Sequence, residues 1–341
     1  MTAGVENRAL GALTGLAVGD ALGMPTQSLD RARIARLYGR LDGLVDALDE
    51  QPIAPGMPAG AVTDDTEQAL LVADLLIDGS GRVEPRAFAD ALVRWESAMR
   101  SKGSLDLLGP STKAAVSAIA DGKDPSRAGL GGTTNGAAMR ITPVAVAVPP
   151  HPPEKLLAAI HALSYVTHNS SIALAGAAAI AGAVSAGVDG SDLDDALAYG
   201  LALADRAAMA APWVAGASIG AKSRWALRCS ASLDEDALAD FLVDVVGTSV
   251  LAQESIVAAI VIADRYRERP YDGLCFAARL GGDTDTVAAM AGAVLGAVHE
   301  PDVFGAETVR QVQAVSRLDL EPVVAGLLRL RGINVRESYD S

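Results

Sequence analysis

Residues 172–188, which read IALAGAAAIAGAVSAGV, form the most apolar stretch of the chain and decide its predicted fold class. A transmembrane helix needs about 20 predominantly apolar residues. This stretch is shorter and consists mainly of alanine and glycine. We therefore predict a buried core helix, whose small side chains would allow neighbouring helices to approach closely.

The composition of the whole chain favours the same kind of interior. Half of the 341 residues are hydrophobic, which excludes a disordered protein. Only 4% are aromatic, so the core has to be filled by closely packed backbones instead of large rings. Many helices with small residues at their contacts satisfy that requirement.

Helical periodicity runs along the chain, with apolar residues at three- and four-residue spacing. The segments are 7–22, 66–78, 85–99, 112–121, 154–165, 170–187, 191–209, 234–246, 250–264, 272–279, 285–298 and 306–318. The one strand-like run, 144–148, is short, ends in PPHPP and is predicted to be a connector. The breaks at 51–60, 101–111 and 129–135 are too short for flexible linkers. We expect residues 1–341 to form one all-α domain.

Charge and cysteine usage restrict the partners and the compartment. A net charge of −14 and a pI near 4.7 argue against binding to nucleic acid, which requires a positive surface. The chain has only two cysteines, Cys229 and Cys275, far apart and without a CxxC motif. They indicate neither a disulfide framework nor a zinc site, which suits a reducing compartment. The N-terminal MTAGVENRAL has no secretory signal pattern. We expect a cytoplasmic protein with no membrane partner, and a monomer by default.

The first candidate site lies in residues 61–71, AVTDDTEQALL. Thr63, Asp64 and Asp65 stand where a loop becomes a helix. Helix capping explains such residues on its own, because they satisfy free N–H groups and the positive end of the helix dipole. Asp64 and Glu67 also fit a capping box loosely.

A second acidic helix start, GGDTDTVAAM at 281–290, makes capping insufficient as an explanation. Capping accounts for one acid, but Asp283, Asp285 and Thr286 offer three acceptors. Four carboxylates that converge would repel one another unless cations lie between them. Oxygen ligands select Mg²⁺, Mn²⁺ or Ca²⁺, and the absence of a histidine cluster disfavours zinc.

Three further segments carry candidate residues with two open interpretations each. The glycine-rich stretch 131–143, GGTTNGAAMRITP, could present backbone N–H groups to a phosphate, or could be a plain turn at Asn135 and Gly136. His168, at a polar helix start, is either a cap or core histidine or a substrate contact. Asp106 lies in a loop punctuated by glycine and proline, where acids are usually solvated or capping.

Taken together and in order, these pieces resemble the ADP-ribosylglycohydrolase family, which includes the dinitrogenase-reductase-activating glycohydrolases and the ADP-ribosyl-acceptor hydrolases. The matching pieces are 19–25 (GDALGMP), 63–66 (TDDT), 131–143, 167–168 and 281–286 (GGDTDT), which span roughly residues 11–300. The resemblance implies an orthogonal all-α bundle. It also implies hydrolysis at the anomeric ribose carbon of an ADP-ribosyl conjugate, which is either a small molecule or protein-linked.

The resemblance also implies specific site residues. Two Mg²⁺ or Mn²⁺ ions would be bound by Thr63, Asp64, Asp65, Asp283, Asp285 and Thr286. The substrate would contact Gly132, Thr133, Asn135, Gly136 and Met139, with His168 nearby. Bound metal would supply an activated water, and a carboxylate, Asp65, Asp283 or Asp106, would handle the proton.

Three departures from the family pattern leave the substrate open. Gln27 stands where some branches carry a glutamate that acts at the metal centre, and an amide can bind but cannot act as a base. Asp106 is the candidate match to an aspartate on which other branches rely. Thr134 replaces a glycine that precedes Asn135 in many relatives. A nucleoside or another simple N-riboside is therefore the alternative substrate, and a non-catalytic ADP-ribose-binding or crystallin-like protein is the third hypothesis.

Overall fold

The computed structural model describes residues 2–101 and 108–333, and no β-strand occurs within these two ranges. The α-helices are α1 (Thr2–Gly23), α2 (Arg31–Tyr38), α3 (Asp64–Asp78), α4 (Pro85–Ser101), α5 (Pro110–Ala120), α6 (Pro125–Ala128), α7 (Gly136–Met139), α8 (Thr142–Ala147), α9 (Pro153–Ser164), α10 (Ser171–Val188), α11 (Leu193–Ala210), α12 (Ile219–Ser230), α13 (Glu235–Asp240), α14 (Ala252–Arg265), α15 (Pro270–Ala278), α16 (Thr284–His299), α17 (Ala306–Ser316) and α18 (Leu320–Leu330). Two 3₁₀ turns, η1 (Met24–Thr26) and η3 (Pro301–Phe304), and a π-helical turn, η2 (Phe241–Val246), lie between them. The predicted all-α class is confirmed.

The Ala-rich helix α10 lies in the interior, as predicted. It has the length and the mean hydropathy, 1.8, of a membrane-spanning helix, but every one of its residues is buried inside the fold. Its small residues allow close contact with α11, because a Cβ added to Gly182 would lie only 2.8 Å from the Cα of Gly200. This backbone proximity replaces the interlocking of large side chains.

Helices α1 and α16 are in backbone contact along their length. A Cβ added to Gly11, Gly15 or Gly19 would lie 2.0–2.2 Å from a carbonyl oxygen of α16. At the end of α1, a Cβ added to Gly23 would lie 2.4 Å from the Cα of Asp285. The glycines recur every fourth residue and so share one face of α1. The C-terminal end of α1 is therefore placed against the start of α16.

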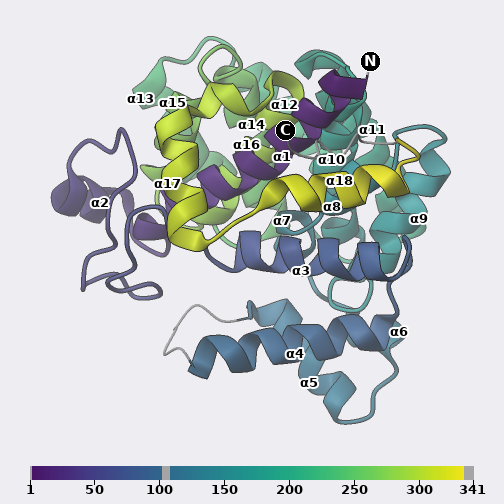
Figure 1. The fold of residues 1–341 in the computed structure, drawn as a ribbon. Coiled ribbons are helices and arrows are strands. Elements are labelled where there is room, and N and C mark those ends of the chain that lie inside the picture. The colour runs from purple at the N-terminus through teal and green to yellow at the C-terminus, as the bar shows by residue number, and fades with distance from the viewer. Residues whose placement is uncertain (1, 102–107, 334–341) are drawn as a thin grey trace, which may run out of the picture.

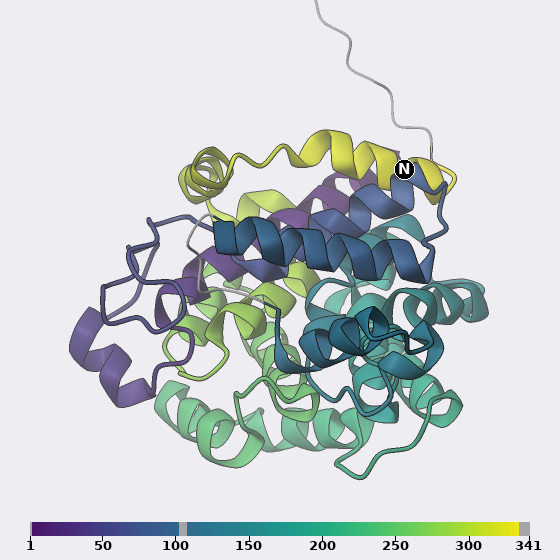
Figure 2. The same ribbon diagram turned by 90° about the horizontal axis from the view of Figure 1, so that it is seen from below.

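The other helices are arranged around α1, α16 and α10, some in contact with them and some in an outer layer. In Figure 1, α3 runs beside α18 and α8, and helices α4, α5 and α6 form an outer layer beyond α3. Helix α2 and the loops that flank it project from the side of the bundle, as the views in Figures 1 and 2 agree.

Sequence patterns misplaced one element and missed several others. Residues 144–148, predicted to be a connector, belong mostly to α8. This short helix has Pro143 in its first turn, where proline is tolerated, and all its residues are buried. Because it is apolar on every side, it carries no helical periodicity. Helices α2, α12 and α18 were not among the predicted segments.

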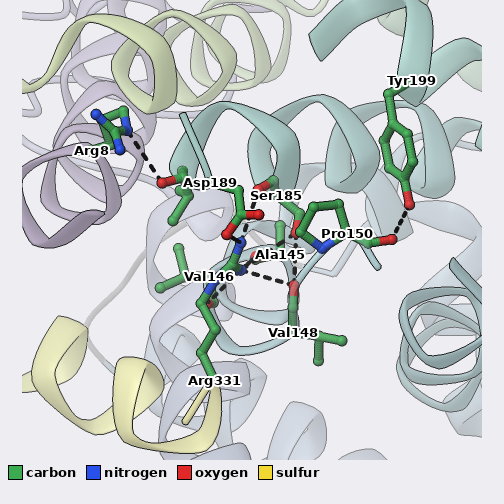
Figure 3. A network of polar contacts seen from close by, with 10 residues as sticks. Arg8, Ala145, Val146, Val148, Pro150, Ser185, Asp189, Tyr199 and Arg331 are labelled. Carbon is green, nitrogen blue, oxygen red and sulfur yellow. Dashed lines mark hydrogen bonds and ion pairs between the residues drawn. The ribbon is translucent and has the colours of Figure 1, made fainter. Parts of the chain in front are cut away.

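A buried arginine ties α18 to the ends of two other helices (Figure 3). The side chain of Arg331 is 1% exposed, and its Nη1 donates to the carbonyl oxygens of Ala145 and Val148 at 2.8 and 2.9 Å. Its Nη2 donates to the carbonyl oxygen of Ser185 at 2.9 Å and pairs with the Asp189 carboxylate at 3.2 Å. One guanidinium thus satisfies the carbonyl groups of Ala145 and Val146, which α8 leaves free because the residues four positions on are prolines, and adds a second donor to Ser185 O at the end of α10.

Replacing Arg331 by methionine is expected to destabilise the fold. The methionine retains much of the apolar volume but leaves the buried carbonyl oxygens of Ala145 and Val146 without donors, a loss of about 3–5 kcal/mol if the buried network is broken. Thermal denaturation measures the effect. Arg329→Met, an exposed position of the same helix, is the control and should melt near the wild-type temperature. Equal melting of both variants would contradict a structural role for Arg331.

Candidate functional site

The two acidic helix starts, far apart in sequence, are brought together by the α1–α16 contact and by a glycine turn. Gly281 and Gly282 both have positive φ, 84° and 80°, a conformation that glycine adopts without steric cost. This turn is held to the segment after η1, because Ser28 N donates to Gly282 O at 2.7 Å and Gly282 N donates to Leu29 O at 3.0 Å. The start of α16 is thereby fixed beside Gln27.

The start of α3 is held by Asp20, a carboxylate from α1. Its oxygens accept hydrogen bonds from the backbone N–H groups and the hydroxyls of Thr63 and Thr66, at 2.6–3.1 Å. Asp20 is 0% exposed, and its burial raises its pKa to about 6 although the hydrogen bonds from Thr66 and Thr63 oppose the shift. Asp20 lies within the GDALGMP piece at 19–25, but the sequence alone indicates no role for it. Its signal was that Asp20 is the single charged residue of the apolar stretch 9–23.

Capping does not explain the acids at either helix start. Thr63 is the N-cap of α3 but its side chain makes no capping hydrogen bond, and Glu67 accepts a hydrogen bond from Trp95 Nε1 at 2.6 Å. At α16 the N-cap Asp283 likewise makes no side-chain capping bond. Its Oδ2 accepts from Asn135 Nδ2 at 2.5 Å instead.

Asp65 is where the two clusters meet. Thr286 Oγ1 donates to Asp65 Oδ2 at 3.1 Å, which links α16 to α3. The other oxygen of this carboxylate, Oδ1, is buried and has no hydrogen-bond partner among the residues described. Burial, together with the charges of Asp285 and Asp64, raises the pKa of Asp65 well above its usual value. The acids predicted to converge are therefore close enough to repel one another.

The residues gathered here fit hard divalent cations in their donor chemistry. Four carboxylates and two threonine hydroxyls supply only oxygen, which Mg²⁺ and Mn²⁺ prefer, and Asp65 Oδ1 is a buried acceptor without a donor. Within the described part of the chain, no three acidic, histidine or cysteine side chains are already arranged to hold one ion. The fit therefore rests on the donor set and on this oxygen.

A pocket of about 280 Å³ opens over the acidic cluster. Among the predicted site residues, its lining includes Gln27, Asp64, Asn135, Gly136, Met139, Asp283, Asp285 and Thr286. Thr63 and Asp65 are buried beneath it, 2% and 0% exposed. Asp106 lies outside the described residues, although Leu108 and Gly109, which follow it closely, line the pocket.

The glycine-rich stretch forms one wall of the pocket. Asn135 N donates to Val250 O and Ala252 N donates to Thr133 O, at 2.9 and 3.1 Å, so the start of α14 fixes this wall. Gly132 O accepts from Ser170 Oγ at 2.6 Å. Gly132 and Thr133 are thus placed near the pocket without lining it.

Several residues that sequence reasoning did not assign to the site belong to its surroundings. Thr134 and Thr112 line the pocket. His168, which the resemblance places beside the substrate, is instead 0% exposed and lies behind Thr134. Arg140 and Gln68 are buried and are hydrogen-bonded to each other at 2.6 Å. The signal for Arg140 was a single cation inside the apolar stretch that follows the glycines.

The raised pKa of Asp20 predicts a specific pH dependence of stability. A carboxyl group whose pKa is higher in the folded than in the unfolded protein binds more protons when folded, so its contribution to stability falls as the pH rises. Relative to Asp20→Asn, the wild type should therefore lose stability as the pH increases from about 4, the unfolded value, through about 6. Melting temperatures of both proteins in a chelating buffer measure this difference. If the melting temperature of the wild type instead rises with pH relative to that of Asp20→Asn, the hydrogen bonds to Asp20 outweigh its burial.

Comparison with known proteins agrees with this fold. A family model described as ADP-ribosylglycohydrolase matches residues 1–334. Protein YegU of Escherichia coli (strain K12) is 32% identical over 326 residues, 95% of this chain and 97% of YegU. ADP-ribosylarginine hydrolase Tri1 of Pseudomonas putida (strain GB-1) is 28% identical over 316 residues, 90% of this chain and 74% of Tri1. A solved structure of an ADP-ribosylglycohydrolase-related protein complex superposes with a TM-score of 0.67 at 27% identity, covering 97% of this chain and 99% of that one.

These matches define an all-helical hydrolase of glycosidic bonds. The chain belongs to the ADP-ribosylglycohydrolase family, with a family match that covers nearly its full length. The resemblance inferred from the five sequence pieces is confirmed.

Proposed function

We propose that this protein hydrolyses the bond between the anomeric ribose carbon of an ADP-ribosyl group and the atom to which it is attached, at the pocket above Asp65. The observation that carries the proposal is the meeting of the two acidic helix starts at this one pocket, joined by the hydrogen bond from Thr286 to Asp65. The names of the relatives, which include an ADP-ribosylarginine hydrolase, support the substrate class.

Two divalent cations, Mg²⁺ or Mn²⁺, would be held by Thr63, Asp64, Asp65, Asp283, Asp285 and Thr286. When bound, they would supply an activated water near neutral pH and a fixed position for the ribose hydroxyls.

Hydrogen bonds around these residues prepare them as ligands. Thr63 Oγ1 donates its proton to Asp20 at 2.7 Å, so the lone pairs of this hydroxyl remain for a cation. Asn135 fixes one oxygen of Asp283, and Thr286 fixes one oxygen of Asp65. Such outer contacts orient metal ligands and maintain their charge state.

The proton of the attacking water would pass to a carboxylate, and Gln27 restricts the choice. Gln27 lines the pocket, but an amide cannot act as a base. Asp283 and Asp65 are the candidates among the described residues, and Asp106 is the candidate outside them. Negative charge at this end of the pocket would also favour an oxocarbenium-like transition state.

A substrate panel tests this function. The purified protein, with Mg²⁺ or Mn²⁺ added, is incubated with ADP-ribosyl-arginine and ADP-ribosyl-serine, and release of ADP-ribose is followed by chromatography. Binding of free ADP-ribose is followed by calorimetry. Cleavage of one conjugate that a chelator abolishes supports the proposal. No cleavage and no binding under all these conditions would refute it.

A simple N-riboside remains the second candidate, favoured by Gln27 and by Thr134, the two departures in the pocket lining. A panel of nucleosides, assayed for ribose release under the same conditions, separates the two substrates. Release of ribose without release of ADP-ribose from any conjugate would reassign the enzyme to nucleosides.

A further inference from the structure

Thr134 separates the pocket from a buried chain of polar side chains. It lines the pocket, and its Oγ1 lies 2.9 Å from Nε2 of His168. His168 is 0% exposed, and the ring also packs against Gly136, whose added Cβ would lie 3.0 Å from Cε1. The hydrogen bond that His168 makes toward the pocket therefore ends at the hydroxyl of Thr134.

The direction of this chain is set at its far end by Arg140. Arg140 Nη2 donates to Thr167 Oγ1 at 2.7 Å, and Thr167 Oγ1 lies 2.8 Å from His168 Nδ1. A guanidinium only donates, so Thr167 Oγ1 accepts from it. The buried hydroxyl then needs an acceptor for its own proton, because an unpaired buried donor is costly. Nδ1 of His168 is the acceptor that the described residues provide.

The tautomer of His168 follows. Its burial and the charge of Arg140 hold its pKa well below the usual value, so the ring is neutral. Since Nδ1 accepts from Thr167, the ring proton is on Nε2, which donates to Thr134 Oγ1. Among the residues described, Thr134 Oγ1 has no second hydrogen bond. Its own proton is therefore available to a molecule in the pocket.

We propose that Thr134 is a substrate-binding residue whose hydroxyl donates a hydrogen bond to a phosphoryl oxygen. The inference rests on the proposed function, which supplies the ADP-ribosyl group as ligand. Arg140, Thr167 and His168 act as positioning residues, since each fixes the proton of the next group in the chain.

A phosphoryl oxygen is the acceptor that this arrangement fits best. All the hydrogen bonds point the same way, from a buried cation toward the pocket, and such chains strengthen the final donor. Hydrogen bonds from a polarised donor to an anionic oxygen are stronger than those to neutral groups. A phosphoryl oxygen only accepts, whereas a ribose hydroxyl can also donate and does not need a donor of fixed direction.

The second hydrogen bond of the Arg140 guanidinium allows the series of hydrogen bonds to Thr134 to be interrupted selectively. Nη1 donates to Gln68 Oε1 at 2.6 Å, and Gln68 Nε2 donates to Asp64 Oδ2 at 2.9 Å. One guanidinium thus orients both the carboxylate of Asp64 and the hydroxyl of Thr134. Removing the hydroxyl of Thr167 interrupts the arm to Thr134 and leaves the arm to Asp64 in place.

The test compares Thr134→Val, which removes the hydroxyl at nearly constant volume, with Thr134→Ser, which retains it. Calorimetry with ADP-ribose in the presence of Mg²⁺ is expected to show binding weakened about 10-fold or more for valine and by no more than about threefold for serine. Phosphorus NMR of bound ADP-ribose should differ between wild type and the valine variant. Unchanged affinity of the valine variant would overturn the inference, as would weakened binding with unchanged phosphorus shifts.

Nitrogen NMR of the histidines tests this series of hydrogen bonds without any ligand. The wild type should show His168 neutral with its proton on Nε2, and Thr167→Val should redistribute the proton between the two ring nitrogens and weaken ADP-ribose binding in the same direction as Thr134→Val. A proton on Nδ1 in the wild type would overturn the assignment. If the wild type does not bind ADP-ribose at all, the proposed function fails together with this inference. Binding by the wild type that the valine variant matches refutes the inference alone.

Discussion

Replacement of Asp64 or Asp283 by alanine is expected to abolish hydrolysis while leaving the fold intact. Each variant removes one carboxylate from the set proposed to hold the divalent cations, and loss of that charge stabilisation corresponds to a rate reduction of about a thousandfold or more, roughly 4 kcal/mol. The measurement is the rate of ADP-ribose release from the conjugate that the wild type cleaves, at saturating Mg²⁺ or Mn²⁺.

Melting temperatures and a matched control variant distinguish this loss of activity from misfolding. In a chelating buffer both variants should melt at or above the wild-type temperature, because removing one acid relieves repulsion within the cluster. Asp236→Ala serves as control, since Asp236 also lies in the first turn of a helix, α13, but its side chain is fully exposed. A severe drop in melting temperature for Asp64→Ala or Asp283→Ala would contradict the interpretation, and so would activity equal to that of Asp236→Ala.

Gly15→Ala is expected to cause a large loss of stability. Alanine in the interior of a helix normally gains about 1 kcal/mol over glycine. Here the added Cβ would lie 2.0 Å from Gly292 O and 2.8 Å from the ring of Phe304. Backbone atoms of both helices meet at this contact, and they cannot move aside as a flexible side chain can. The cost should therefore reach or exceed the upper end of the about 1–3 kcal/mol typical of overpacked cores.

The control for this variant lies in the same helix. The atoms nearest to a Cβ added to Gly4 belong to the flexible guanidinium of Arg8, the closest 3.2 Å away, so Gly4→Ala should be neutral or slightly stabilising. Urea denaturation of the three proteins gives the comparison. Gly15→Ala should also lower hydrolysis, because the contact that it breaks positions Asp285. Similar denaturation midpoints for Gly4→Ala and Gly15→Ala would show that α1 and α16 can separate without cost.

The sequence predicted the core helix and both acidic helix starts, because each leaves a local pattern. Residues 172–188 are apolar without interruption, and the acids of each cluster are adjacent in the chain. The sequence did not indicate which helices pack against one another. The glycines of α1 recur every fourth residue, a spacing that indicates a close helix contact, but many stretches of this chain are rich in alanine and glycine. Nothing local identifies α16 as the partner.

Residues that act on distant backbone groups were the hardest to predict. Asp20 lies inside α1, and its donors belong to the start of α3, 43 and 46 positions along the chain. Thr134 and His168 were considered separately, since only the fold places one behind the other. Capping was a reasonable interpretation of Thr63 and Asp283 by sequence. It fails because the Thr63 hydroxyl donates to Asp20, which itself accepts from Thr66 N, and because the Asp283 carboxylate accepts from Asn135.

The contact between α1 and α16 also has a consequence for how the protein is made. Thr284 bonds to Gly23 across 261 residues of sequence. At a synthesis rate of roughly 5–20 residues per second, α1 has left the ribosome for on the order of 10–50 s before α16 exists. Contacts this distant in sequence make folding slow, and the glycine face of the nascent α1 has no α16 to pack against throughout that interval. Folding of the interior and assembly of the pocket above Asp65 are then one late event, so a chain interrupted before α16 has neither.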